Sequence, residues 1–186
     1  MSQQTAEAVR GVRIPLVPET RRHRTLEERM LVRFPGLARQ LSAAWARLPQ
    51  HSRLRRAILV RRVRQGFAAL DRRDFDLLVI GLDPGVELHM GHVLPDIGPV
   101  FHGHEGYREA WRHLLEAADT HLAPEELLDL GDRVLVTAKL TAQGTGSGVL
   151  VSQPLFLLLT LRGGLVVREH DFQDRAEALR AAKLSE

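Results

Sequence analysis

Two carboxylates stand two residues apart in a segment that should form the last long strand of the chain, 165–172. Because side chains alternate along a strand, one face should carry Val167, Glu169, Asp171 and Gln173, and Val166 and His170 should lie on the other. Neighbouring carboxyl groups in an apolar setting have raised pKa values and can share a proton, which suits general acid–base catalysis. The alternative is that they form salt bridges with the many arginines at a rim or a dimer interface.

A histidine provides a second candidate group. His89 should share a face of a short strand, 86–90, with Glu87, where it could hydrogen-bond a ligand carbonyl or orient Asp171 as a base. The alternative is a hydrogen-bonded histidine at the edge of a sheet. His89, His92, His102 and His104 also have the spacings H-x-x-H and H-x-H, but most of them fall in a loop. We therefore predict no metal site, and no cofactor.

The basic residues are unevenly distributed. Residues 1–73 hold 17 of the 26 basic residues and 5 of the 23 acidic ones, so a basic N-terminal part precedes an acidic body. Six of the arginines lie on an expected helix from about Ser52 to Leu70: Arg53, Arg55, Arg56, Arg61, Arg62 and Arg64. Such a helix could contact nucleic acid or anionic lipid, but aromatic side chains interleaved for single-strand binding are missing. A solvated face, or one docked on the acidic body of the same or a second subunit, is the interpretation we favour.

The elements that must position these groups follow from periodicity and from capping signals. Residues 1–24 should be a disordered or extended arm, and 25–64 a basic helical extension. Thr25 and Glu28 form a capping box, Pro35 interrupts the first helix, and Ser52 caps the third. After the turn 83–85, we expect a strand at 86–90, a loop at 94–106, a helix at 107–118 and strands at 127–130, 133–142, 149–161 and 165–172. A short helix capped by Asp174 closes the chain. Helices followed by a strand, a helix and an antiparallel meander indicate an α+β fold.

Five segments in this order look familiar: GFAALDRRDFD (66–76), VELHM (86–90), HGHEGYREAW (102–111), ELLDLGDRVLVTAKLTAQGTGSGV (126–149) and QPLFLLLTLRGGLVVREHDFQDRAEAL (153–179). Residues 65–184 thereby resemble the SnoaL-like branch of the nuclear transport factor 2-like superfamily. The resemblance implies a conical curved antiparallel sheet wrapped around helices, with an internal pocket, in a bacterial homodimer. It does not imply one activity, since relatives include ketosteroid isomerase, polyketide cyclases, epoxide hydrolases, dehydratases and non-catalytic binders.

The resemblance also implies roles for particular residues. Asp171 should point into the cone, and Trp111 and Tyr107, one helical turn apart, should line it, unless they simply pack in the core. Chemistry of the ketosteroid isomerase type is disfavoured because the first helix of the domain offers no tyrosine for an oxyanion hole.

Taken together, the sequence predicts a protein that binds a hydrophobic small molecule in an apolar pocket. Acid–base chemistry of an isomerase, cyclase or hydrolase type would run through Asp171 and His89, with Trp111, Tyr107, Glu169 and Glu87 as ligand-binding candidates. The alternative is a non-catalytic dimeric module whose arginine-rich helices dock a protein, lipid or nucleic-acid partner. The absence of cysteine, of a secretory signal and of a long apolar run leads us to expect a cytoplasmic protein with no membrane span.

Overall fold

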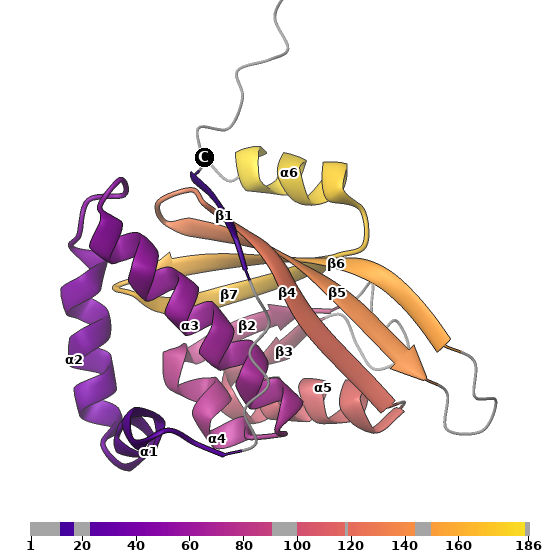
Figure 1. Ribbon diagram of the computed structural model, residues 1–186, viewed down its shortest axis with the longest axis horizontal. Helices are drawn as coiled ribbons and strands as arrows, with labels where there is room; N and C mark the ends of the chain where they lie inside the picture. The colour runs from indigo at the N-terminus through magenta and orange to yellow at the C-terminus, as the bar shows by residue number, and fades with distance from the viewer. Residues whose placement is uncertain (1–11, 17–22, 91–99, 118, 144–149, 185–186) are drawn as a thin grey trace, which may run out of the picture.

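Seven strands form one curved, unclosed sheet in the computed structural model, which describes residues 12–16, 23–90, 100–117, 119–143 and 150–184 (Figure 1). The strand order is β1-β4-β5-β6-β7-β2-β3. Neighbouring strands are antiparallel except β2 and β7, which are parallel. The strands are β1 (Val12–Pro15), β2 (Leu82–His89), β3 (Val100–His102), β4 (Asp119–Asp129), β5 (Arg133–Gln143), β6 (Leu150–Arg162) and β7 (Leu165–Phe172). The α+β fold expected from the sequence is confirmed.

The helices begin where the capping signals place them. They are α1 (Leu26–Arg33), α2 (Pro35–Ala46), α3 (Arg53–Asp71), α4 (Phe75–Leu78), α5 (Gly103–Ala117) and α6 (Arg175–Leu184), with a short 3-10 helix at Val79–Gly81. Thr25 and Glu28 complete the predicted capping box, and Ser52 accepts a hydrogen bond from the backbone of Arg55. Pro35 starts α2 and thereby separates it from α1, because a proline amide cannot donate within a helix.

The sheet has an apolar layer on each face. On the inner face, the stripe of α3 (Leu59, Val63, Phe67 and Leu70) and that of α5 (Tyr107, Trp111, Leu114 and Leu115) pack against the strands. On the other face, α6 covers a smaller cluster that includes Leu135, Phe156, Leu158 and Phe172 (Figure 1). The middle of β6 is buried on both faces, as its continuous apolar run predicts.

Several strands are longer than the sequence suggests. Within the arm expected at 1–24, Val12–Pro15 pairs with β4, so this part is extended; residues 1–11 and 17–22 lie outside the described residues. β4 begins at Asp119, not at residue 127, because a register shift between Pro124 and Glu126 fits the proline into the strand. The expected turn at 83–85 lies within β2, where the register also shifts. The expected loop 94–106 contains β3 and the start of α5, and its residues 94–99 are outside the described part.

Candidate functional site

Strand β7 carries both carboxylates of the acidic pair on the inner face of the sheet. Glu169 is 3% exposed and Asp171 is fully buried. Arg168, the residue before Glu169 on the same strand, is exposed on the other face. Residues two apart on a strand point the same way, so the predicted alternation of Glu169 and Asp171 is present. Neither Asp171 oxygen, nor Oε1 of Glu169, has a hydrogen-bond partner among the described residues.

A bulge in β7 changes which neighbouring residue lies on the same face of the sheet as Glu169. The β6–β7 register passes from the pair Thr160–Arg168 to the pair Leu161–Val166, which leaves Val167 as the extra residue. As a result Val166 lines the same cavity as Glu169, although strict alternation places Val166 on the opposite face and Val167 beside Glu169. This prediction of the sequence is therefore wrong, since a single inserted residue reverses the faces of a strand.

Tyr107 holds one oxygen of Glu169. Its hydroxyl, on the first turns of α5, donates a 2.6 Å hydrogen bond to Glu169 Oε2, and both residues are buried. Burial raises the pKa of Glu169 to about 7 and raises the pKa of Asp171 well above its usual range, an effect to which the charge of Glu169 adds. Burial likewise raises the pKa of Tyr107, so the phenol stays protonated. Near neutral pH, Glu169 can therefore either accept or donate a proton.

A cavity of about 170 Å³ lies against this carboxyl group. The residues around it are mostly apolar, among them Leu59, Val63, Phe67, Leu157 and Leu159, and Trp111 and Tyr107 line it as the resemblance implies. Among the lining residues, the ones with titratable side chains are Glu169, Tyr107 and Arg62. The cavity thus offers an apolar body with very few polar groups, which is the usual make-up of a small-molecule site.

The N-terminal extension supplies one side of the cavity. Leu31 of α1 and Ala38 and Trp45 of α2 line it together with the residues of the sheet and α5. The β6–β7 hairpin lies directly against α2: at Gly164, with φ +78°, an added Cβ would overlap the carbonyl oxygen of Ser42. Helix α2 can rest there only because position 164 has no side chain.

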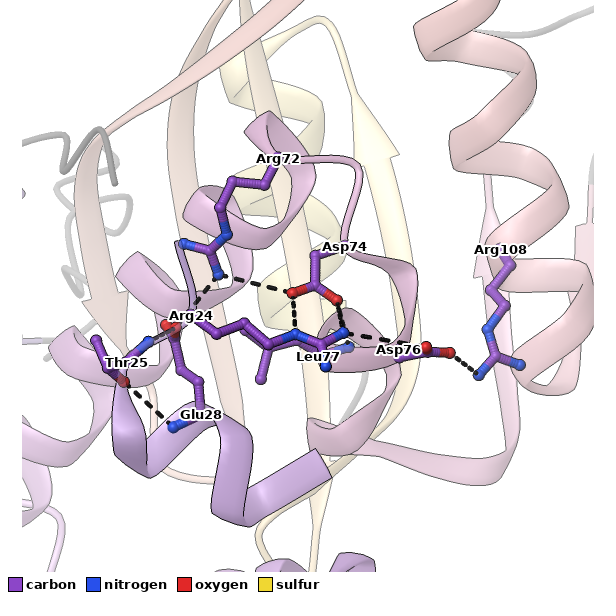
Figure 2. A network of polar contacts seen from close by, with 8 residues as sticks. All are labelled: Arg24, Thr25, Glu28, Arg72, Asp74, Asp76, Leu77 and Arg108. Carbon is purple, nitrogen blue, oxygen red and sulfur yellow. Dashed lines mark hydrogen bonds and ion pairs between the residues drawn. The ribbon is translucent and has the colours of Figure 1, made fainter. Parts of the chain in front are cut away.

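A network of ion pairs fastens the start of the extension to the domain (Figure 2). Arg24 forms a two-pronged ion pair with Asp74, and the Arg72 guanidinium lies 3.4 Å from Glu28 Oε2 and 3.9 Å from Asp74 Oδ2. Asp74 also accepts a hydrogen bond from the backbone of Leu77 and so caps α4. Because Glu28, Arg72 and Asp74 are at most a tenth exposed at their side chains, this network fixes α1 beside α4.

The fold has counterparts in known proteins. A family model described as a SnoaL-like domain matches residues 63–169, which is more than half of the 186 residues. The chain belongs to the SnoaL-like domain family. The matched part of the SnoaL-like domain contains Tyr107, Trp111 and Glu169, while the extension that lines the cavity precedes it.

Solved structures match the SnoaL-like domain at low sequence identity. TerC co-crystallised with polyporic acid is 24% identical, with a TM-score of 0.54 over 67% of this chain and 97% of that chain. An NTF2-like protein of unknown function from Burkholderia pseudomallei is 24% identical, with a TM-score of 0.54 over 64% and 93%. A protein with a ketosteroid isomerase-like fold from Catenulispora acidiphila, in complex with trimethylamine, is 18% identical, with a TM-score of 0.53 over 66% and 92%. These likenesses establish the fold. A search of curated proteins finds no match.

His89 and Glu87 lie on the face of the sheet opposite to the cavity. In the parallel pairing, His89 stands beside His170 and their rings are 5.1 Å apart, while Leu88 stands beside Glu169. His89 Nε2 lies 3.4 Å from Glu87 Oε2, and Arg168 donates to the same oxygen at 2.9 Å. The structure therefore does not bring His89 to Asp171 or Glu87 to the cavity, because odd and even residues of β2 face opposite sides.

Asp171 lies beyond the cavity. It is not among the residues that line it, since two residues of strand displace it roughly 7 Å along β7 from Glu169. Of the four histidines, His104 contacts the Leu82 carbonyl at 3.3 Å and His92 lies outside the described residues. No group of three possible metal ligands occurs in the described part of the chain.

The arginines of α3 divide into buried and exposed ones. Arg55 is 5% exposed and forms hydrogen bonds of 3.0 and 3.2 Å with the two carboxylate oxygens of Asp129, itself 1% exposed, so the basic extension does dock on the acidic body of the same chain. Arg62 lines the cavity. No helix in the described ranges is long and apolar enough to cross a membrane.

Sequence reasoning missed Trp45 and Arg62 as parts of the cavity. Trp45 is one of a stripe of apolar residues in α2, and Arg62 is one of six arginines on α3. The available signal was position: Arg62 is three residues after Leu59 and next to Val63, so it borders the buried stripe of α3, not its solvent face.

Proposed function

We propose that this protein binds a small, mainly apolar molecule in the cavity beneath α1–α3 and that Glu169 moves a proton to or from it. The observation that carries the proposal is the state of Glu169: Tyr107 holds one oxygen, the other has no hydrogen-bond partner among the described residues, and burial raises its pKa to about 7. A carboxyl group of this kind is poised for general acid–base catalysis at neutral pH. The family setting, which includes cyclases and isomerases by resemblance, supports the same class of chemistry.

In this proposal Tyr107 is a positioning residue. Its hydrogen bond fixes Glu169 Oε2, so the proton is exchanged at Oε1. Asp171 belongs to the same buried pair. Burial and the charge of Glu169 raise the pKa of Asp171 well above its usual range, so Asp171 keeps its proton when Glu169 ionises. Because Asp171 does not line the cavity, it makes no contact with the ligand in this proposal.

Proton abstraction is testable without knowing the natural substrate. Cyclohexanone is of a size suited to the cavity, and exchange of its α-hydrogens in D₂O can be followed by proton NMR. We expect the protein to accelerate this exchange and Glu169→Gln to lower the protein-dependent rate at least tenfold. Glu87→Gln, the same change on the opposite face of the sheet, should leave it unaltered. Equal rates for the protein and Glu169→Gln would overturn the catalytic part of the proposal.

A second candidate function, an interaction module, is supported by exposed apolar side chains on the extension. Leu26 and Met30 on α1, and Phe34 at the junction with α2, recur every four residues. Leu37 and Leu41 do so on α2, and each of the five is at least 43% exposed. Exposed apolar faces of this kind mark protein contacts. Sedimentation should then show a dimer that Phe34→Ser combined with Leu41→Ser converts to a monomer. A monomer at all concentrations would refute the dimeric module.

A further inference from the structure

Arg62 is a cavity residue whose charge is incompletely satisfied. It lies at the middle of α3, where it donates a 2.8 Å hydrogen bond to Ser42 Oγ and a 3.3 Å hydrogen bond to the Gly164 carbonyl. Its guanidinium carbon also lies 5.3 Å from the centre of a ring of Trp45. All of these partners are neutral, so they orient the guanidinium group without neutralising it.

No carboxylate within the described residues forms an ion pair with Arg62. Its neighbours on the same helix are different: Arg55 pairs with Asp129 and Arg61 with Glu27. Burial lowers the pKa of Arg62 to about 10, so the group still carries its charge at neutral pH. Arg62 is half-buried, and a charge held partly out of water without a counter-ion carries a desolvation cost that an anionic ligand would offset.

The size and lining of the cavity restrict the rest of the ligand. Its volume of about 170 Å³ is similar to that of an engineered cavity of about 150 Å³ in another protein, which binds benzene. Apolar residues such as Leu59, Val63 and Val166 form most of the walls. One ring, or an aliphatic chain of similar volume, therefore fits against these walls, and a charged group of the ligand would have to meet Arg62.

We propose that the ligand of this cavity is a small apolar carboxylic acid, with a single ring or its equivalent in the cavity and its carboxylate bound to Arg62. A guanidinium group presents parallel N–H donors that match the two oxygens of a carboxylate, which a single ammonium group does not. This inference rests on the proposed function, because it names the class of molecule that the same cavity accepts. It adds a residue outside the matched family region to the binding site.

Phenylacetate and 2-phenylacetamide test the inference, because they have nearly the same shape and differ in charge. Calorimetric titration at pH 7.5 should show the 186-residue protein binding phenylacetate at least tenfold more tightly than the amide. Arg62→Met, which keeps an unbranched side chain but removes the guanidinium group, should abolish this preference. Arg62→Lys should retain part of it, and the matched control Arg53→Met, an exposed position at the start of α3, should retain all of it.

The outcomes separate this inference from the proposed function. Equal binding of phenylacetate and the amide, or a preference that survives in Arg62→Met, would overturn the anion-binding role and leave small-molecule binding in place. Failure of both compounds to bind would overturn both proposals. Because Arg62 also contacts Ser42 and Gly164, a thermal melt of each variant accompanies the titrations. If Arg62→Met does not fold, the comparison of the parent protein with Arg62→Lys decides, since a reduced preference in Arg62→Lys supports the two-pronged contact and an undiminished preference opposes it.

Discussion

Arg55 and Arg62 stand seven residues apart on α3, and each guanidinium carbon lies 5.3 Å from the centre of a Trp45 ring. Arg55 is matched to a buried carboxylate, Asp129, and also donates to the Gly131 carbonyl. Arg62 has neutral partners and borders a cavity. Two arginines on one face of α3 thus have different roles. Arg55 fixes the extension to the sheet, and Arg62 keeps a charge available beside the apolar cavity.

The same contrast separates the buried carboxylates. Asp129 is held by Arg55 and by the backbone amide of Gly131, so its charge is fully compensated. Glu169 and Asp171 are buried as deeply, but no cation pairs with them in the described part of the chain, and their pKa values rise instead. A buried acid that is paired with an arginine contributes to the structure, whereas a buried acid left with only a phenol can exchange protons.

The largest effect on stability should come from breaking the buried ion pair between Arg55 and Asp129. Asp129→Ala leaves the Arg55 guanidinium buried without a counter-ion, and a loss of about 3–5 kcal/mol in the free energy of unfolding is expected. A urea titration measures it. Replacing both residues by apolar ones of similar size should recover much of that loss, because it removes the uncompensated charge. A loss below about 1 kcal/mol in the single variant would contradict this account.

The stability that Glu169 contributes to the fold should change with pH in the opposite sense to that of a carboxylate held in a salt bridge. The pKa of Glu169 is about 7 in the fold against 4.5 for a glutamate exposed to water, so the folded protein holds its proton more tightly. The corresponding stability is complete below pH 4.5 and is lost as the pH rises through 7. Glu169→Gln should therefore be more stable than the parent at pH 8, by up to about 3 kcal/mol, and lose that advantage at pH 4. Denaturant titrations at the two pH values measure the difference; a constant difference would show that Glu169 titrates normally.

A smaller effect should follow from pushing α2 away from the hairpin. Gly164→Ala places a Cβ against the Ser42 carbonyl at a backbone conformation that alanine rarely adopts, and a cost of roughly 1–3 kcal/mol is expected. Since Ser42 and Trp45 orient Arg62, the variant should also weaken the preference for phenylacetate over its amide. Gly163→Ala is the matched control: its φ is +58°, but nothing lies within 4 Å of the added carbon. Equal effects of the two changes would show that backbone strain, not the contact with α2, is responsible.

The smallest effect should come from the outer face of the sheet. His89→Ala removes a side chain that contacts Glu87 and His170 on the face away from the cavity, so it should change the exchange rate of cyclohexanone less than twofold. Nuclear magnetic resonance of the same reaction provides the measurement. A tenfold loss of the exchange rate would support the catalytic role that the sequence predicts for His89.

The parts of this molecule that sequence predicts well are those decided by near neighbours. The capping box of Thr25 and the break at Pro35 depend on residues three or four positions away, and both are present. The burial of Tyr107 and Trp111 follows from helical periodicity alone. Strand Val12–Pro15 is different, because its partner β4 is more than a hundred residues away and its own composition carries no strand signal.

The sequence predicts an apolar site with inward carboxylates, but not which residues line it. The inward face of Glu169 and Asp171 follows from alternation, yet which of them meets the cavity depends on where α5 places Tyr107. The bulge at Val167 arises from the pairing of β6 with β7 and has no local sequence signature. The position of Arg62 beside the buried stripe of α3 separates it from Arg61, which is 61% exposed at its side chain, but its place in the cavity depends on the packing of α2 and the hairpin.

The family match begins at Val63, immediately after Arg62, while the cavity draws residues from both sides of that boundary. Glu169 and one wall of the cavity around it are thus supplied by separate stretches of the chain. If the proposed function holds, an extension grafted from another such protein would reshape that wall while leaving the Glu169 carboxyl group in place.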